Sequence, residues 1–187
     1  MTGEFLTEGL QNDRYLKAIR LIEQFEIEME ARLRKLGRRM VDKHPSLFGS
    51  PLETSTSSSR DSGKTLAYQR IDYKMRGVQV SDDESTPRLN VHFYWVDPAK
   101  YARTDIDGAL RAFGYKIKFA NTNVDEQVAD QTRASDWPIE ITDDPFGSRK
   151  IFYKHVNSIG DIEETANSLV DHFSEFGNAY TENSSMR

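Results

Sequence analysis

Residues 11–41 constrain the fold more than any other part of the sequence, because they form one uninterrupted helical pattern. The stretch contains no proline, and its apolar residues recur at spacings of three, four and seven positions. At 1.5 Å per residue the predicted helix is a rod of roughly 45 Å, which is long for a globular protein. Its apolar stripe needs a covering surface. The stripe comprises Tyr15, Ile19, Ile22, Met29, Leu33, Leu36 and Met40.

A second helix is predicted over residues 161–180, where apolar side chains alternate at spacings of four and three. Asp161 begins it, with Glu164 as a capping-box partner. Residues 66–156 form a strand-rich region of alternating apolar and polar side chains. Within this region we predict one short helix, which begins at Asp105 and ends before Gly114. The predicted strands lie within 66–80, 89–96, 115–119, 139–141 and 151–156.

Residues 45–65 are rich in serine, threonine and proline, and we expect a mobile loop there. The whole chain, 1–187, is interpreted as a single α+β domain. Its sheet has about five strands, antiparallel or mixed, and the long N-terminal helix and the C-terminal helix pack on one face. The predicted core contains Ile19, Ile22, Met29, Leu33, Ile71, Tyr73, Val91, Phe93, Trp95, Ile117, Ile141, Ile151, Leu169 and Phe173.

Composition narrows the class of protein. The chain has no cysteine, which excludes disulfides and cysteine-based metal sites. It has no apolar run long enough for a transmembrane helix, and residues 1–5 lack the features of a signal peptide. We therefore expect a cytoplasmic protein with no membrane partner and no cofactor. A net charge of −5 argues against a sequence-blind nucleic-acid binder.

One strand carries the pattern of a metal site. Asp72 and Lys74 lie two apart, with Asp61 upstream, and such a group can hold Mg²⁺ and activate water. The triplet resembles the core of restriction-type nucleases, which implies a metal-dependent nuclease. The resemblance covers three residues, and the Pro-Asp element of that family is absent, since Arg60 precedes Asp61. A chain with this many charges produces such triplets by chance, so a cross-strand ion pair on a solvated face is the favoured interpretation.

The C-terminal helix offers a weaker candidate. Asp171, His172 and Glu175 have spacings at which side chains of one helix can share a metal ion. These three residues lie off the apolar stripe, however, so we expect them to face water.

The predicted strands carry an excess of lysine and arginine. If their apolar residues face the helices, most of this positive charge falls on the opposite, exposed face of the sheet. Basic side chains interleaved with aromatic ones suit phosphate backbones, single-stranded bases or an acidic protein. A polar outer face with protected edges would look the same without a ligand. The candidate binding residues are Arg70, Lys74, Arg76, His92, Tyr94, Lys116, Lys118 and Lys150.

The long helix supplies the main functional expectation. Strands of this length span only roughly 17–27 Å, so the rod extends beyond the sheet. Apolar residues past the sheet lie exposed unless another chain covers them, or unless a bend near Gly37 or the C-terminal helix buries them. We expect a non-catalytic interaction module, a subunit or accessory of a larger assembly. It forms a homo-oligomer or hetero-complex through this helix.

Overall fold

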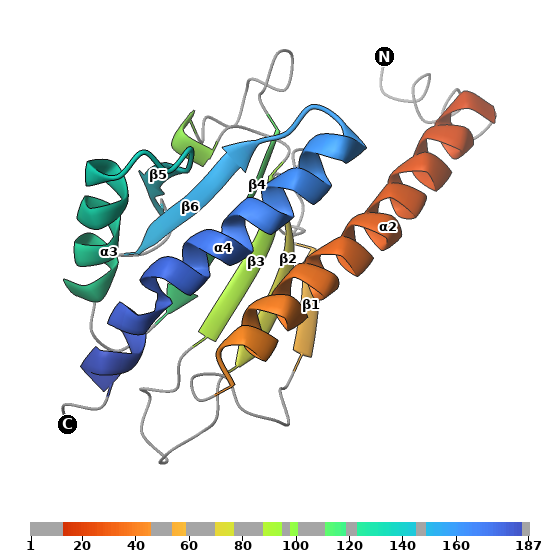
Figure 1. The fold of residues 1–187 in the computed structure, drawn as a ribbon. Helices are drawn as coiled ribbons and strands as arrows, with labels where there is room; N and C mark the ends of the chain where they lie inside the picture. The colour runs from red at the N-terminus through yellow and green to blue at the C-terminus, as the bar shows by residue number, and fades with distance from the viewer. Residues whose placement is uncertain are drawn as a thin grey trace, which may run out of the picture.

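The structure is a computed structural model in which residues 13–45, 54–58, 70–76, 88–94, 98–100, 111–118, 123–144 and 149–184 are described. It has the α+β architecture expected from the sequence, with helices lying against one twisted sheet (Figure 1). In chain order the elements are α2 (Asp13–Lys43), β1 (Thr54–Ser58), β2 (Arg70–Arg76), β3 (Arg88–Tyr94), the short 3₁₀ helix η1 (Pro98–Lys100), β4 (Ala112–Lys118), α3 (Asn123–Ala134), β5 (Glu140–Asp143), β6 (Lys150–His155) and α4 (Ile159–Ser184).

Within the described residues the sheet has six strands, in the order β1-β2-β3-β4-β6-β5. Every neighbouring pair is antiparallel, which decides between the two alternatives left open by the sequence. The four strands from β1 to β4 follow one another in sequence as a meander, and β5 pairs with β6 at the edge of the described sheet.

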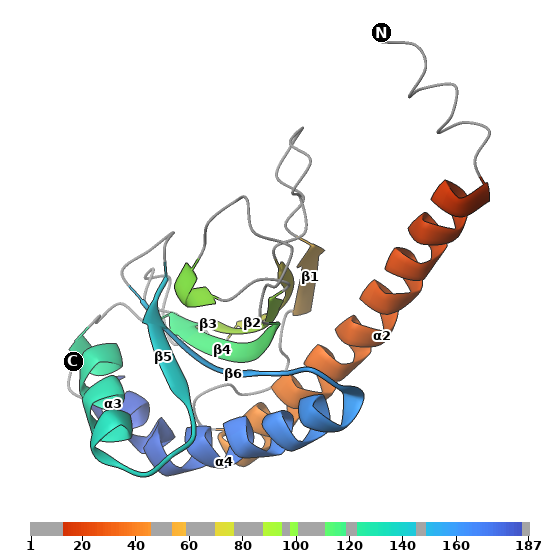
Figure 2. The same cartoon turned by 90° about the horizontal axis from the view of Figure 1, so that it is seen from above.

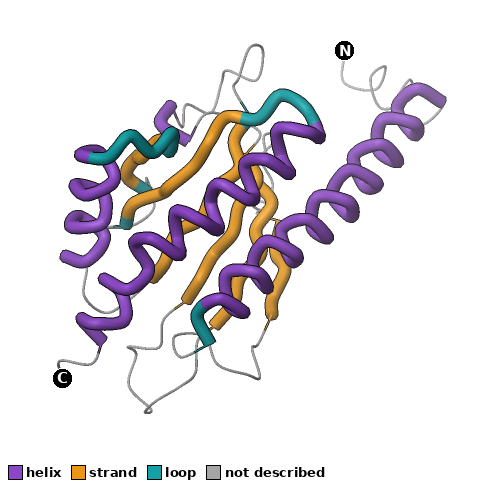
Figure 3. Tube along the Cα trace, in the orientation of Figure 1, coloured by secondary structure: helices purple, strands orange, loops and turns teal. Residues whose placement is uncertain are grey.

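Both long helices cover the same face of the sheet, as predicted. Helix α2 packs against β2, β3 and α4, whereas α4 packs against β4 and β6. Figures 2 and 3 show the two helices side by side on this face, with α3 beyond α4. We refer to the side that carries α2 and α4 as the helix face, and to the opposite side as the second face.

The main core lies between the helix face and these helices. The strand register puts Leu89, Val91 and Phe93 of β3 beside Ile117, Tyr115 and Phe113 of β4, and all six side chains are buried. Of the predicted core, Met29, Leu33, Val91, Phe93, Ile117, Leu169 and Phe173 are confirmed, while Ile141 is partly buried against this core. Ile151 is buried in a smaller cluster with Tyr94, Ala112 and Tyr153. The side chains of Ile71, Tyr73 and Trp95 lie outside the described part.

Two members of the predicted core are not core residues. The side chains of Ile19 and Ile22 are 37% and 44% exposed. The apolar stripe continues into the first half of α2 as its spacing implies, but the sheet does not extend far enough to cover it.

The predicted loop 45–65 contains a strand. Thr54–Ser58 forms β1, which pairs with β2 from Thr54 opposite Met75 to Ser58 opposite Ile71. The sequence did not predict this strand, because its serines and threonines show no alternation of apolar and polar residues. A short edge strand needs no such alternation when its partner strand sets the register.

The helix predicted over 105–113 is wrong at its end, since Ala112 and Phe113 belong to β4 and Gly114 lies inside that strand. Gly114 is required there by a close approach rather than by a helix end. A Cβ at this position would lie 2.5 Å from the carbonyl oxygen of Phe152 and 2.7 Å from Cβ of Tyr153.

Helix α4 begins two residues before the predicted start, and its capping box is Ser158 with Asp161. The backbone N–H of Asp161 donates to the Ser158 hydroxyl at 3.1 Å, and the Asp161 carboxylate accepts from the backbone N–H of Ser158 at 3.0 Å. A hydrogen bond from the Ser158 side chain, followed by one from the backbone N–H of Asn157, lowers the pKa of Asp161. The predicted capping box of Asp161 with Glu164 is wrong, because Asp161 is the second member of the box and not the first.

Candidate interaction surface

The first half of α2 extends away from the rest of the protein (Figure 2). Among the described side chains of this helix, Met29 is the first buried one. The ring of Phe25, half-buried, is centred 5.3 Å from that of Phe93 in β3, which marks where the helix reaches the sheet. We call residues 13–28 the free segment of α2. Because α2 is one continuous helix to Lys43, no bend at Gly37 returns this segment to the core.

The free segment exposes large apolar side chains. Leu16, Leu21 and Ile27 are 50%, 67% and 70% exposed, and Ile19 and Ile22 are also exposed. On a helical projection Leu16, Ile19, Ile22 and Ile27 fall within an arc of roughly 140°. This is the width of the apolar side of a helix that packs in a protein interior.

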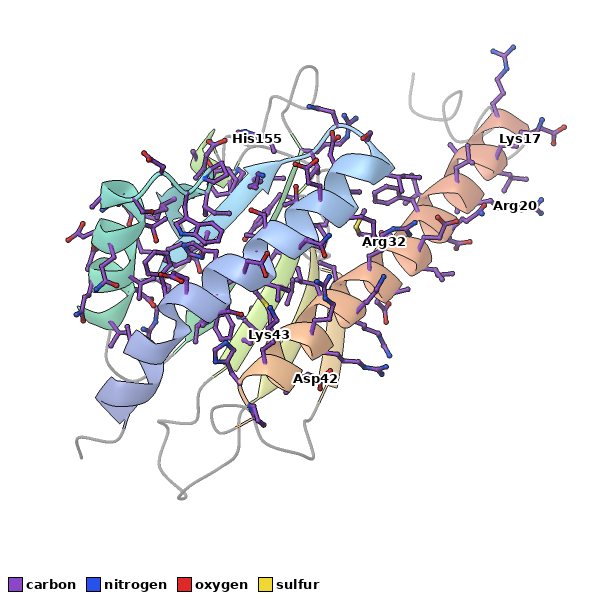
Figure 4. All side chains as sticks on the ribbon, in the orientation of Figure 1. Lys17, Arg20, Arg32, Asp42, Lys43 and His155 are labelled. Carbon is purple, nitrogen blue, oxygen red and sulfur yellow. The ribbon has the colours of Figure 1, made fainter. Side chains whose placement is uncertain are left out.

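The charges of the free segment divide at its midpoint. Residues 13–20 carry three basic side chains and one acidic one, whereas residues 21–28 carry three acidic side chains and no basic one. Figure 4 shows Lys17 and Arg20 projecting from the end of α2 that is remote from the sheet. The segment therefore has a cationic half and an anionic half of equal length.

Four of the eight predicted binding residues are buried or mostly buried. His92 and Tyr94 share the second face, but both are fully buried. Lys116 also lies on this face, mostly buried, and forms an ion pair with Asp144. Lys150 lies on the helix face, because it is two residues before Phe152 on the same strand. Its Nζ lies 2.8 Å from Glu126 and 2.6 Å from Asp143. The expectation of an exposed surface is wrong for these four residues.

The remaining basic candidates are placed by register alone. Arg70 lies opposite Tyr94, and Lys74 lies opposite Asn90. Arg76 lies opposite Arg88, which in turn lies opposite Lys118. The register thus puts three basic residues in one row across β2, β3 and β4, a row that includes Arg88, which the sequence did not single out.

The nuclease hypothesis finds no site among the described residues. Asp61 and the side chains of Asp72 and Lys74 lie outside the part that the structure describes. The register puts Asp72 opposite His92 and Lys74 opposite Asn90, so no acid–lysine pair faces across β2 and β3. Within the described ranges, no three histidine or acidic side chains are grouped as metal ligands.

The prediction that His172 faces water is wrong, although Asp171 and Glu175 are exposed. His172 is fully buried between α4, β4 and α3, with the rings of Trp137, Phe152 and Phe176 around it. Its Nδ1 lies 2.5 Å from the hydroxyl of Tyr115, and its Nε2 lies 2.9 Å from the hydroxyl of Thr132.

These distances assign the protons of the network. The Thr132 hydroxyl donates to the carbonyl oxygen of Val128 at 2.7 Å, so it accepts from the Nε2–H of His172. The Nδ1 of His172 then accepts from the Tyr115 hydroxyl. Burial lowers the pKa of His172 to about 4, and burial with the nearby Asp125 carboxylate raises the pKa of Tyr115. The imidazole is neutral and enclosed, and it links two helices to the sheet.

Ion pairs join the start of α3 to the sheet, one of them buried and one at the surface. Arg149, next to β6, lies 3.4 Å from Asp125 in the first turn of α3, and both are buried. The hydrogen bond that Lys150 donates to Asp143, followed by the one that it donates to Glu126, raises the pKa of Lys150. These charges neutralise one another, so they form a structural contact rather than a charged surface.

Comparisons of the chain with protein-family models, with curated proteins and with solved structures found no match. None of the described helices combines the length and the apolar character that crossing a membrane requires. The free segment of α2 is therefore the candidate site that the geometry itself defines.

Proposed function

We propose that this protein is a non-catalytic interaction module that docks into a larger assembly through the free segment of α2. The exposure of Leu16, Ile19, Ile22 and Ile27 on one side of a projecting helix carries the proposal. Scattered exposed apolar residues are ordinary, but a continuous group along one rod marks an interaction site.

The two halves of α2 support this reading. Met29, Leu33, Leu36 and Met40 are buried where the sheet and α4 lie beside the helix. Ile19 and Ile22 continue the same stripe with the same spacing and have no such cover. The apolar stripe thus runs along the whole of α2, but only its second half is covered. This is expected if a partner covers the first half.

The test compares two altered forms of the full chain in the cells that make it. One form carries Leu16→Ser, Ile19→Ser and Ile22→Ser, and the control carries Gln24→Ser, an uncharged position on the polar side of the same segment. We expect the wild type and the control to elute as an assembly larger than 21.5 kDa, and the first form to elute as the free chain. Equal elution of all three would contradict the proposal.

The row of Arg76, Arg88 and Lys118 supports a second candidate function, the binding of a phosphate-rich ligand such as single-stranded nucleic acid. Like charges directly opposite one another on neighbouring strands destabilise a sheet, and a bound anion offsets that repulsion. The connection between β2 and β3 carries Asp82, Asp83 and Glu84, whose negative charge opposes such a ligand.

A salt series tests this candidate. We expect single-stranded DNA to bind more weakly as salt rises, and Arg88→Gln to lower the slope of log K against log salt by about one. The control is Lys150→Gln, because Lys150 is already paired with Asp143 and Glu126. Absence of binding by the wild type at low salt would exclude the candidate.

A further inference from the structure

We propose that the partner of the free segment is a second copy of this chain, and that the two α2 helices pair antiparallel about a twofold axis. This inference rests on the proposed function, since it names the partner of the same segment. It is carried by four residues that lie on one side of the helix, Leu16, Arg20, Glu23 and Ile27.

These four positions form one narrow face. Their spacings are four, three and four, so on a helical projection they lie within roughly 60° of one another. All four side chains are exposed. Within the described part of the chain, neither Arg20 nor Glu23 has an ion-pair partner.

The face is complementary to itself when reversed. Read from the N-terminus it is apolar, basic, acidic and apolar, and its spacing is the same in both directions. In an antiparallel pair, Leu16 therefore lies opposite the second copy's Ile27, and Arg20 lies opposite the second copy's Glu23. The twofold axis repeats both contacts, as an interface between identical patches requires.

The wider charge distribution selects the same direction. Antiparallel pairing puts the cationic half, residues 13–20, along the anionic half, residues 21–28, of the second copy. Parallel pairing would put Arg20 beside Arg20 and Glu23 beside Glu23, which is unfavourable at distances within the Debye length of about 8 Å.

The first experiment measures the mass of the purified full chain over a wide range of concentrations. We expect it to rise from 21.5 kDa toward that of a dimer. Arg20→Glu alone, or Glu23→Arg alone, puts like charges opposite each other, and we expect each change to weaken dimerisation on the order of tenfold. The double change Arg20→Glu with Glu23→Arg restores opposite charges and should restore the dimer.

The double variant is also the control for net charge and for helix content, both of which match the wild type. The proposed pairing is overturned if the single charge reversals leave dimerisation unchanged, or if the double change does not restore it. These residues are exposed, so circular dichroism should show all forms equally folded.

A second experiment tests direction. The chain has no cysteine, so Leu16→Cys and Ile27→Cys each introduce a single thiol. Antiparallel pairing predicts that a mixture of the two variants oxidises to a disulfide between unlike chains. Disulfides formed only between identical variants would overturn it.

Failure of this inference is distinguishable from failure of the proposed function. A wild-type chain that stays monomeric at every concentration rules out self-pairing. The proposed function still stands in that case if the apolar changes at Leu16, Ile19 and Ile22 dissociate an assembly in cells, and it falls if they do not.

Discussion

His172 shows how burial sets the chemistry of a single residue. The folded protein holds its imidazole neutral, because burial lowers its pKa to about 4 from 6.5. The unfolded chain takes up a proton there below pH 6.5, and the folded chain does so only near pH 4. The stability contributed by the neutral imidazole is therefore complete above pH 6.5 and is lost as the pH falls from 6.5 to about 4.

We expect this residue to lower the free energy of unfolding by up to about 3 kcal/mol between pH 6.5 and pH 4. His172→Phe should flatten that part of the pH profile. At pH 7 it should reduce stability by about 1–3 kcal/mol, since the buried Tyr115 hydroxyl loses its acceptor. Urea unfolding of both forms across this range measures the difference, and parallel profiles would refute the assignment.

Gly114 is the residue at which the sheet tolerates least change. Gly114→Ala puts a methyl group 2.5 Å from the carbonyl oxygen of Phe152, so β4 and β6 must separate. We expect a loss of about 1–3 kcal/mol in the free energy of unfolding. The control is Gly160→Ala in the first turn of α4, where the nearest atom is 3.6 Å away and the change should be neutral or stabilising.

At the scale of elements, α2 is one helix in two environments. Leu33→Ala removes a fully buried side chain and should lower the free energy of unfolding by about 2–5 kcal/mol. Ile22→Ala, in the exposed free segment, should change it by less than about 1 kcal/mol in dilute protein. Thermal or urea unfolding at low concentration compares them. Equal losses would mean that the free segment is covered within one chain.

The sequence predicted those elements that carry a strong period. The bounds of α2 differ from expectation by two residues at each end, and the alternation in β3 placed Val91 and Phe93 correctly in the core. The sequence did not predict β1, because its serines and threonines show no hydrophobic periodicity. The start of β4 was also missed, because Gly114 was interpreted as the end of a helix. A glycine is ambiguous in sequence, because a helix end and a close strand approach both require it.

The candidate site was predictable only in part. The overhang of α2 followed from its length, and the exposure of Ile19 and Ile22 agrees with it. The burial of His92, Tyr94 and His172 could not be predicted from the sequence. Periodicity predicts which face of a strand or helix a side chain lies on, but not whether another part of the chain covers that face. The pairing of Lys116 with Asp144 joins residues far apart in sequence, which no local pattern reveals.

At the scale of the whole molecule, self-pairing links stability to concentration. If only the folded chain dimerises, the melting temperature of the wild type should rise with protein concentration. That of Arg20→Glu should rise much less, and the double variant with Glu23→Arg should behave like the wild type. Calorimetry at low and high concentration provides the measurement, and a wild-type melting temperature independent of concentration would contradict dimerisation.

The attachment of α2 at one end only also affects how fast a partner can be captured. Starting a helix from a disordered chain is unfavourable, because several residues must be fixed before the first hydrogen bond forms. In this protein the sheet and α4 hold the second half of α2, so helical turns can propagate outward from Met29 into the free segment without a new nucleus. A binding partner thus meets a preorganised rod, and complex formation need not await the ordering of a peptide.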